Sequence, residues 1–155
     1  MLSLFFVDEL SGSKTQILDS DEAHHAIKVM RLKIGEEIKI SDGEGSWVSG
    51  PISEIAKKSL KITVTSNGVE KNKKNELILV QAINKSDRNK EMLELITVAG
   101  VDRIIPWQAD RCISKWQSNS YDKWSTSIKE ASKQSRRVNL PKLEKVMSTK
   151  QIIEQ

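Results

Sequence analysis

The first seventy residues contain short apolar or alternating stretches that are separated by turn residues. Stretches of this kind predict β-strands that bury one or both faces. Three of them are Leu4–Val7, Glu37–Ser41 and Leu60–Val64, and the last is expected to end at the turn sequence Ser66–Gly68. A second turn sequence, Asp42–Gly45, predicts a hairpin that leads into a further strand.

One helical pattern interrupts these strands. Ala23, Ala26 and Ile27 recur at the spacing of a single helix face, and Asp19 with Glu22 predicts a capping box at the start of that helix. Several short strands around one helix predict a small β-barrel over residues 1–70. Residues 71–75 contain no apolar side chain and are expected to form a linker.

After the linker, strands and helices are expected to alternate. The nearly continuous apolar run Leu77–Ile83 predicts a parallel strand that is covered on both faces. Val101–Trp107 predicts a second strand, interrupted by Pro106, which has no N–H to donate. Helices are predicted over residues 86–99, 120–137 and 149–154. Residues 76–155 therefore form an incomplete α/β domain, since two strands and three helices leave strand edges without partners, and the fold class is α+β overall.

Composition adds limits to this picture. The chain has 155 residues, of which 37% are hydrophobic and 30% charged, as in soluble globular proteins. Its single cysteine, Cys112, excludes a disulfide framework. The apolar run Leu4–Val7 is too short for a secretion signal, so we expect a cytoplasmic protein that does not enter a membrane.

The formal net charge of +4 is unevenly divided between the two halves. Residues 1–70 contain 8 Lys and Arg against 11 Asp and Glu, whereas residues 71–155 contain 17 against 10. A polyanion such as RNA would therefore find its counter-charges in the second half. The alternative is that the helix within the Lys- and Arg-rich stretch 111–142 simply presents a solvated face.

The common catalytic motifs are absent from this sequence. It contains no GxGxxG, P-loop, CxxC or HExxH motif, so it carries neither a nucleotide-phosphate nor a zinc signature. His24 and His25 would point about 100° apart on a helix and could not both bind one metal. Cys112 has no nearby histidine partner. We expect no metal, and packing or hydrogen-bonding roles for these residues.

The order of several segments is more specific than any of these motifs. The segments are Phe5–Val7, His24–Glu36 and Asp42-Gly43 in the first half, and Gln81–Arg88, Ala99–Pro106, Asp110–Cys112, Glu130–Arg137 and Leu140-Pro141 in the second. Together they resemble, nearly end to end, the RsmE family of bacterial 16S rRNA (uracil-N3) methyltransferases, which belongs to the SPOUT superfamily.

The resemblance implies a PUA-like β-barrel that helps to hold RNA, followed by the first part of a SPOUT-type α/β methyltransferase domain. In the family, the C-terminal part of that domain forms a trefoil knot that binds S-adenosylmethionine and dimerises. The implied reaction is methylation of N3 of a uridine, with 16S rRNA in the small ribosomal subunit as partner. The family's Gly-Pro-Glu-Gly-Gly loop does not occur here. We therefore expect no cofactor-binding residue in this chain, and no general base can be assigned.

Candidate RNA-binding residues lie at a predicted helix end. Gln134 and Arg137 match the family's Gln-x-x-Arg position, and Arg136 adds a second guanidinium. Guanidinium groups suit phosphates and base edges. Alternatively, both arginines complement the negative C-terminal end of their own helix.

Four further candidates follow the two predicted strands, Lys85 and Arg88 after the first and Arg111 and Lys115 after the second. Open α/β sheets bind ligands beyond the carboxyl ends of their strands, which predicts RNA contacts for all four. For the first two, an ion pair with Asp87 or Glu91 at the start of the helix is the alternative.

Arg31 matches a family position in the barrel, and it either contacts RNA or pairs with a carboxylate such as Glu36. Trp107, Trp116 and Trp124 lie among basic residues, a pattern that can build a stacking platform for unpaired bases. Their spacing favours a core position for two of the three.

Three hypotheses follow from the sequence. The chain is a piece of an rRNA uracil-N3 methyltransferase that contributes RNA recognition and scaffold, a non-catalytic rRNA-binding module or inactive truncated relative, or a remnant that folds poorly. The motifs retained in the second half disfavour the third hypothesis.

Overall fold

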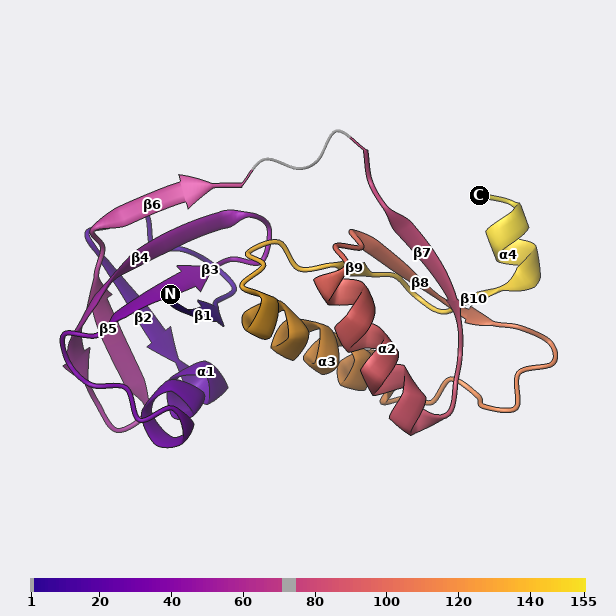
Figure 1. Ribbon diagram of the computed structural model, residues 1–155, viewed down its shortest axis with the longest axis horizontal. Helices are drawn as coiled ribbons and strands as arrows, with labels where there is room; N and C mark the ends of the chain where they lie inside the picture. The colour runs from indigo at the N-terminus through magenta and orange to yellow at the C-terminus, as the bar shows by residue number, and fades with distance from the viewer. Residues whose placement is uncertain (1, 71–74) are drawn as a thin grey trace. The chain divides into compact units, whose positions relative to one another are not determined.

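The computed structural model describes residues 2–70 and 75–155 and contains two compact units (Figure 1). The first unit comprises Met1–Asn72 and Arg136–Asn139, and the second comprises Lys73–Ser135 and Leu140–Gln155. Of the expected linker, residues 71–74 lie outside the described residues.

The first unit is built on one six-stranded sheet. Its strands are β1 (Ser3–Phe6), β2 (Thr15–Asp19), β3 (Glu37–Ser41), β4 (Ser46–Ile55), β5 (Ser59–Thr63) and β6 (Ser66–Val69). The order is β1-β3-β4-β5-β2, with β6 also paired to β4. The β1–β3 pair is parallel and the other pairs are antiparallel.

A single apolar core lies inside this sheet. Phe5 from β1 and Leu18 from β2 belong to the same buried cluster as Ile38 of β3, Ile52 of β4 and Ile62 of β5. Because β1 and β2 are the two ends of the strand order, their shared cluster means that the sheet curls around its own core. The predicted strands of this half are therefore confirmed, with β2 and β6 added.

The predicted capping box is wrong. Asp19 does precede a helix, α1 (Ser20–His24), but its side chain makes no capping hydrogen bond. The Glu22 carboxylate instead accepts the backbone N–H of Phe6 at 3.2 Å, in a buried position. The helix then continues as a π-helix, η1 (His25–Val29).

The predicted turn at Ser66–Gly68 is also wrong, since these residues lie in β6. Gly68 is opposite Trp47 in the ladder. A β-carbon at position 68 would lie 2.7 Å from the indole ring, so the glycine allows close packing rather than a turn.

Residues 136–139, which we call the return segment, belong to the first unit. The Ser41 hydroxyl donates to the Val138 carbonyl oxygen at 2.9 Å, and Glu44 forms an isolated antiparallel bridge with Asn139. Val138 and Ser41 are both 0% exposed. These contacts anchor the return segment at the β3–β4 turn.

The second unit has a parallel sheet around β8 (Arg103–Gln108). The strand β7 (Ile78–Ala82) pairs on one side, and the short strands β9 (Lys142–Leu143) and β10 (Met147–Ser148) pair on the other.

The strand β8 runs through Pro106 without interruption, contrary to prediction. The Ile104 oxygen accepts from Glu144, whereas the Trp107 oxygen accepts from Ile83 on the β7 side. Alternate residues therefore face opposite neighbours, and Pro106 faces the gap between β9 and β10, where no N–H is required.

The helices α2 (Ser86–Val98) and α3 (Ser120–Ser135) pack together over one face of this sheet (Figure 1). Leu93, Ile104, Trp124 and Ile128 form the buried cluster beneath them. The short helix α4 (Thr149–Ile153) begins with a complete capping box at Ser148, which confirms the predicted start.

The prediction that the first parallel strand is covered on both faces is wrong for the residues described. Leu79 packs against the cluster, but Ile78 and Val80 are exposed. The strand β7 lies at the edge of the sheet, and α2 and α3 cover the face that carries Leu79.

We expect Ser41→Ala to destabilise the first unit by about 1–3 kcal/mol, because a fully buried hydroxyl bond network is lost. The hydroxyl lies 2.9 Å from the carbonyl oxygens of both Ser46 and Val138, either of which can accept its proton, and it accepts the N–H of Gly43 at 3.0 Å. Amide hydrogen exchange at Ile38 and Ile40 reports the stability of this unit alone.

The matched control is Ser53→Ala, which removes an exposed hydroxyl that donates to the Lys61 carbonyl at 3.1 Å. Its effect should stay within about 0.5 kcal/mol. Equal losses in the two variants would contradict the anchoring role of Ser41.

Candidate functional site

The parallel strands β7, β8 and β10 end at the same edge of the second unit's sheet. We call the residues that follow them, 83–88, 109–116 and 149–153, the carboxyl edge. In open α/β sheets, ligands bind beyond this edge. Four of the residues predicted to contact RNA lie there, namely Lys85, Arg88, Arg111 and Lys115.

The side chain of Asn89 fixes the loop that follows β7. The Asn89 amide accepts the backbone N–H of Asn84 at 3.1 Å and donates to its carbonyl oxygen at 2.9 Å. Lys85 is the N-cap of α2, and its carbonyl oxygen accepts the Arg88 N–H at 3.0 Å. The exposed side chains of Lys85 and Arg88 therefore extend from a fixed turn.

The exit from β8 is closed in the same manner by Gln108. Its amide donates to the Ser114 carbonyl at 3.2 Å and accepts the N–H of Trp116 at 2.9 Å. The loop between these contacts carries Arg111 and Lys115, both exposed. Because these two bonds join the start of the loop to its end, Arg111 and Lys115 extend from an ordered backbone.

The exit from β10 leads directly into α4. The Trp107 indole donates to the Thr149 hydroxyl at 3.1 Å. Trp116 and Trp124 instead meet edge to face at 5.1 Å within or against the buried cluster. The predicted core position of two of the three tryptophans is confirmed.

Among the described side chains of the carboxyl edge, no ion pair joins Glu91 to Lys85 or Arg88, and the side chain of Asp87 lies outside the described residues. Arg111 and Lys115 also form no ion pair within the described residues.

Three of the other four candidates belong to the first unit. Arg136 lies in the return segment, where its guanidinium donates to the Leu2 carbonyl oxygen. Arg137 is half-buried next to it in sequence, and both follow the end of α3. Arg31 is exposed. The fourth candidate, Gln134, lies in the last turn of α3 and lines a cleft that adjoins the carboxyl edge.

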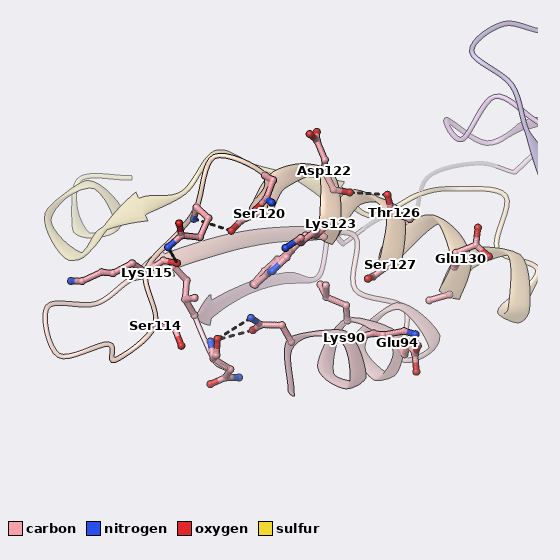
Figure 2. Close-up of a pocket in the computed structure, with 18 of the residues that line it drawn as sticks. Lys90, Glu94, Ser114, Lys115, Ser120, Asp122, Lys123, Thr126, Ser127 and Glu130 are labelled. Carbon is pink, nitrogen blue, oxygen red and sulfur yellow. Dashed lines mark hydrogen bonds and ion pairs between the residues drawn. The ribbon is translucent and has the colours of Figure 1, made fainter. Parts of the chain in front are cut away.

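That cleft, of about 1180 Å³, lies between α2, α3 and the segment before α3. Figure 2 shows Lys90 and Glu94 of α2 on one side and Lys123, Ser127 and Glu130 of α3 on the other. Trp124 and Leu93 are among the apolar lining residues. Sequence reasoning missed the cleft because its two walls are helices far apart in the chain.

Charge distinguishes the cleft from the carboxyl edge. Of the lysines in its lining, Lys90 and Lys123 belong to the cleft alone and are offset by three carboxylates, Glu94, Asp122 and Glu130, whereas Lys115 also belongs to the carboxyl edge. Lys90 also lies 4.0 Å from Glu94. A charge-balanced cleft does not favour a polyanion, whereas the carboxyl edge presents unbalanced cations.

The residues of the carboxyl edge do not fit S-adenosylmethionine. The N–H groups of Asn84, Trp116 and Gln151 are already donated to side chains of the same loops. The only glycine after position 68, Gly100, ends α2 with a φ of 89°. The described residues therefore offer no glycine-rich cradle for a cofactor.

Two further findings concern the described residues only. They contain no group of three or more His, Cys, Asp or Glu side chains placed to hold a metal ion. None of their helices is long and apolar enough to cross a membrane.

Comparison with known families agrees with this two-unit organisation. A family model described as an RNA methyltransferase PUA domain matches residues 18–65, and one described as an RNA methyltransferase domain matches residues 70–155. The chain belongs to this RNA methyltransferase family. The predicted resemblance to the RsmE family is confirmed by the relatives.

The ribosomal RNA small subunit methyltransferase E of Mycobacterium bovis is 31% identical over 97% of this chain and 60% of its own length. A predicted RNA methyltransferase from Thermotoga maritima is 27% identical, with a TM-score of 0.76 over 95% of this chain and 65% of that one. The methyltransferase E structure from Neisseria gonorrhoeae, bound to S-adenosyl methionine, is 22% identical, with a TM-score of 0.86 over 100% of this chain and 66% of that one. This member of the RNA methyltransferase family thus spans less than two thirds of these relatives and has the PUA-plus-methyltransferase fold.

We expect Gln108→Ala to loosen the loop after β8, because both hydrogen bonds that close it are lost. Trypsin cleaves after Arg111 and Lys115, so limited proteolysis should cut this loop several-fold faster in the variant. Gln117→Ala, which removes only one long hydrogen bond to the Lys115 carbonyl at 3.4 Å, is the control. Unchanged cleavage in the Gln108 variant would show that the loop is held by other contacts.

Proposed function

We propose that this chain supplies RNA recognition and scaffold for S-adenosylmethionine-dependent methylation of N3 of a uridine in 16S rRNA. The observation that carries the proposal is the carboxyl edge, where Lys85, Arg88, Arg111 and Lys115 extend from two fixed loops of a methyltransferase domain that follows a PUA domain.

The chemistry of the proposed reaction assigns this chain a positioning role. N3 of uracil is a weakly acidic imide, so methyl transfer requires removal of its proton and in-line placement of the methyl donor. Positioning and electrostatics can supply much of such a rate. Cations that bind phosphates on each side of the target uridine would hold its base at a fixed place and orientation.

S-adenosylmethionine supplies the methyl group in this proposal. The Neisseria gonorrhoeae relative is bound to it, but the carboxyl edge of this chain has no cradle for it. We assign cofactor binding, the trefoil knot and homodimerisation to the part of the relatives that lies outside the matched region. The proposed partner is the cytoplasmic small ribosomal subunit.

A second candidate function is a non-catalytic rRNA-binding module. The observation in its favour is that the carboxyl edge contains no glycine and that its Asn84 and Trp116 N–H groups are already bonded to side chains of their own loops. Both candidates require RNA binding, and they differ in whether methyl transfer follows.

For the chain as given, calorimetric titration with S-adenosylmethionine should show no heat of binding, because the loops of the carboxyl edge contain no glycine to form a cradle for it. Titration of a full-length relative under the same conditions is the positive control. Micromolar affinity of this chain would overturn the assignment of the cofactor site to the unmatched region.

The combined variant with Lys85, Arg88, Arg111 and Lys115 changed to Gln should bind a small-subunit rRNA fragment more weakly. Each lost phosphate contact lowers the slope of log affinity against log salt by about 0.7–0.9, so four contacts predict a decrease of about three. Fluorescence anisotropy over a salt series measures this slope.

The control changes Lys90, Lys123, Lys142 and Lys145 to Gln, which removes the same charge from other surfaces of the second unit. Its slope should change much less. Equal slopes in the two variants would mean that the attraction comes from net charge rather than from the carboxyl edge.

A further inference from the structure

The segment Lys28–Ile34 of the first unit has an unusual backbone. It begins in the π-helix η1, and the Met30 N–H bonds to the His25 carbonyl oxygen. Arg31 then adopts a φ of +56°, a left-handed conformation that glycine would take at lower cost. π-Helical turns and such outliers cluster at functional sites.

This segment exposes three aliphatic side chains within six residues. Val29 is 62% exposed, Met30 42% and Ile34 66%. Leu32, between them, packs against the core of the unit and fixes the loop. An exposed apolar surface beside charged groups is typical of an interaction site.

Three cations alternate with these aliphatic side chains, Lys28, Arg31 and Lys33, and all are exposed. Within the described residues, none of them forms an ion pair. The nearest carboxylate in sequence, Glu36, accepts the backbone N–H of Lys33 at 2.9 Å. The sequence alternative, in which Glu36 pairs with Arg31, is therefore not what the structure shows.

Two other cations of the first unit are engaged by neighbouring side chains. The Lys39 ammonium lies 3.9 Å from the Trp47 ring centre. Lys61 donates to Glu54 at 2.9 Å and holds the pKa of that carboxyl below its ordinary value. Lys57 and Lys58, in the β4–β5 turn, are exposed, but their sequence neighbours are Ala56 and Ser59 rather than exposed large aliphatic side chains.

The net negative charge of the rest of the first unit contrasts with the three cations of this segment. Residues 1–70 carry 11 acidic against 8 basic residues, so a polyanion is repelled by much of this unit. The Lys28–Ile34 segment is a local positive site on an acidic surface, which directs a polyanion to it.

We propose that Lys28–Ile34 is an RNA-docking surface that takes unpaired nucleotides, with the three cations on phosphates and Val29, Met30 and Ile34 against base faces. This inference rests on the proposed function, since RNA is the partner. Single-stranded RNA fits better than a duplex, because base faces are accessible only where bases are unstacked.

The test compares the variant with Lys28, Arg31 and Lys33 changed to Gln against the control Lys57→Gln with Lys58→Gln, using fluorescence anisotropy with a single-stranded oligonucleotide from small-subunit rRNA. The triple variant should lower the salt slope by about two and weaken binding at least tenfold at low salt. The control should change the slope by less than half as much. Equal slope changes per charge would overturn the docking surface and leave the proposed function standing.

A second variant separates base contact from phosphate contact. Ile34→Ser should weaken binding of the single strand several-fold without changing its salt slope, and should leave binding of the matching duplex unchanged. Equal losses for strand and duplex, or no loss for either, would overturn the contact with unpaired bases. Hydrogen exchange at Ile38 and Ile40 checks that each variant is folded, and a wild-type chain that binds no RNA overturns both proposals.

Discussion

Parallel pairing of β7, β8 and β10 is the constraint on which the candidate site depends. Parallel strands end at the same edge, so the residues that follow β7 and β8 are brought together although about twenty-five residues separate them in the chain. Basic residues on loops at different edges of the sheet would not form one cationic surface. At this edge Lys85, Arg88, Arg111 and Lys115 form a cationic border. The central strand β8 remains continuous through Pro106.

Hydrogen bonds of a few uncharged side chains then fix this border. Asn89 and Gln108 each fix one loop with two hydrogen bonds to the backbone. These bonds occupy the N–H groups of Asn84 and Trp116 and order the loops that carry the four cations. The same loops contain no glycine, so at this edge the chain presents fixed cations and no glycine-rich cradle.

Much of the fold could be predicted from the sequence because it depends on local periodicity. The strands β1, β3, β5, β7 and β8 and the helices α2, α3 and α4 carry their own apolar pattern or caps. The strands β9 and β10 have two residues each and show no period. Glu22 fits a capping box by spacing, but the N–H of Phe6 is a distant partner that spacing does not show. Four candidate residues of the site could be predicted because they follow the ends of predicted strands. The contact of Arg136 with Leu2 could not be predicted, because the two residues are 134 positions apart.

The central claim is that RNA meets this chain at the carboxyl edge. Its most direct test is a titration of the ¹⁵N-labelled chain with a small-subunit rRNA fragment, followed by amide chemical shifts. The account predicts the largest shifts in the second unit at residues 84–88 and 109–115, with little change at the charge-balanced cleft residues Lys90, Glu94 and Glu130. Shifts centred on that cleft, with the two loops unchanged, would contradict it.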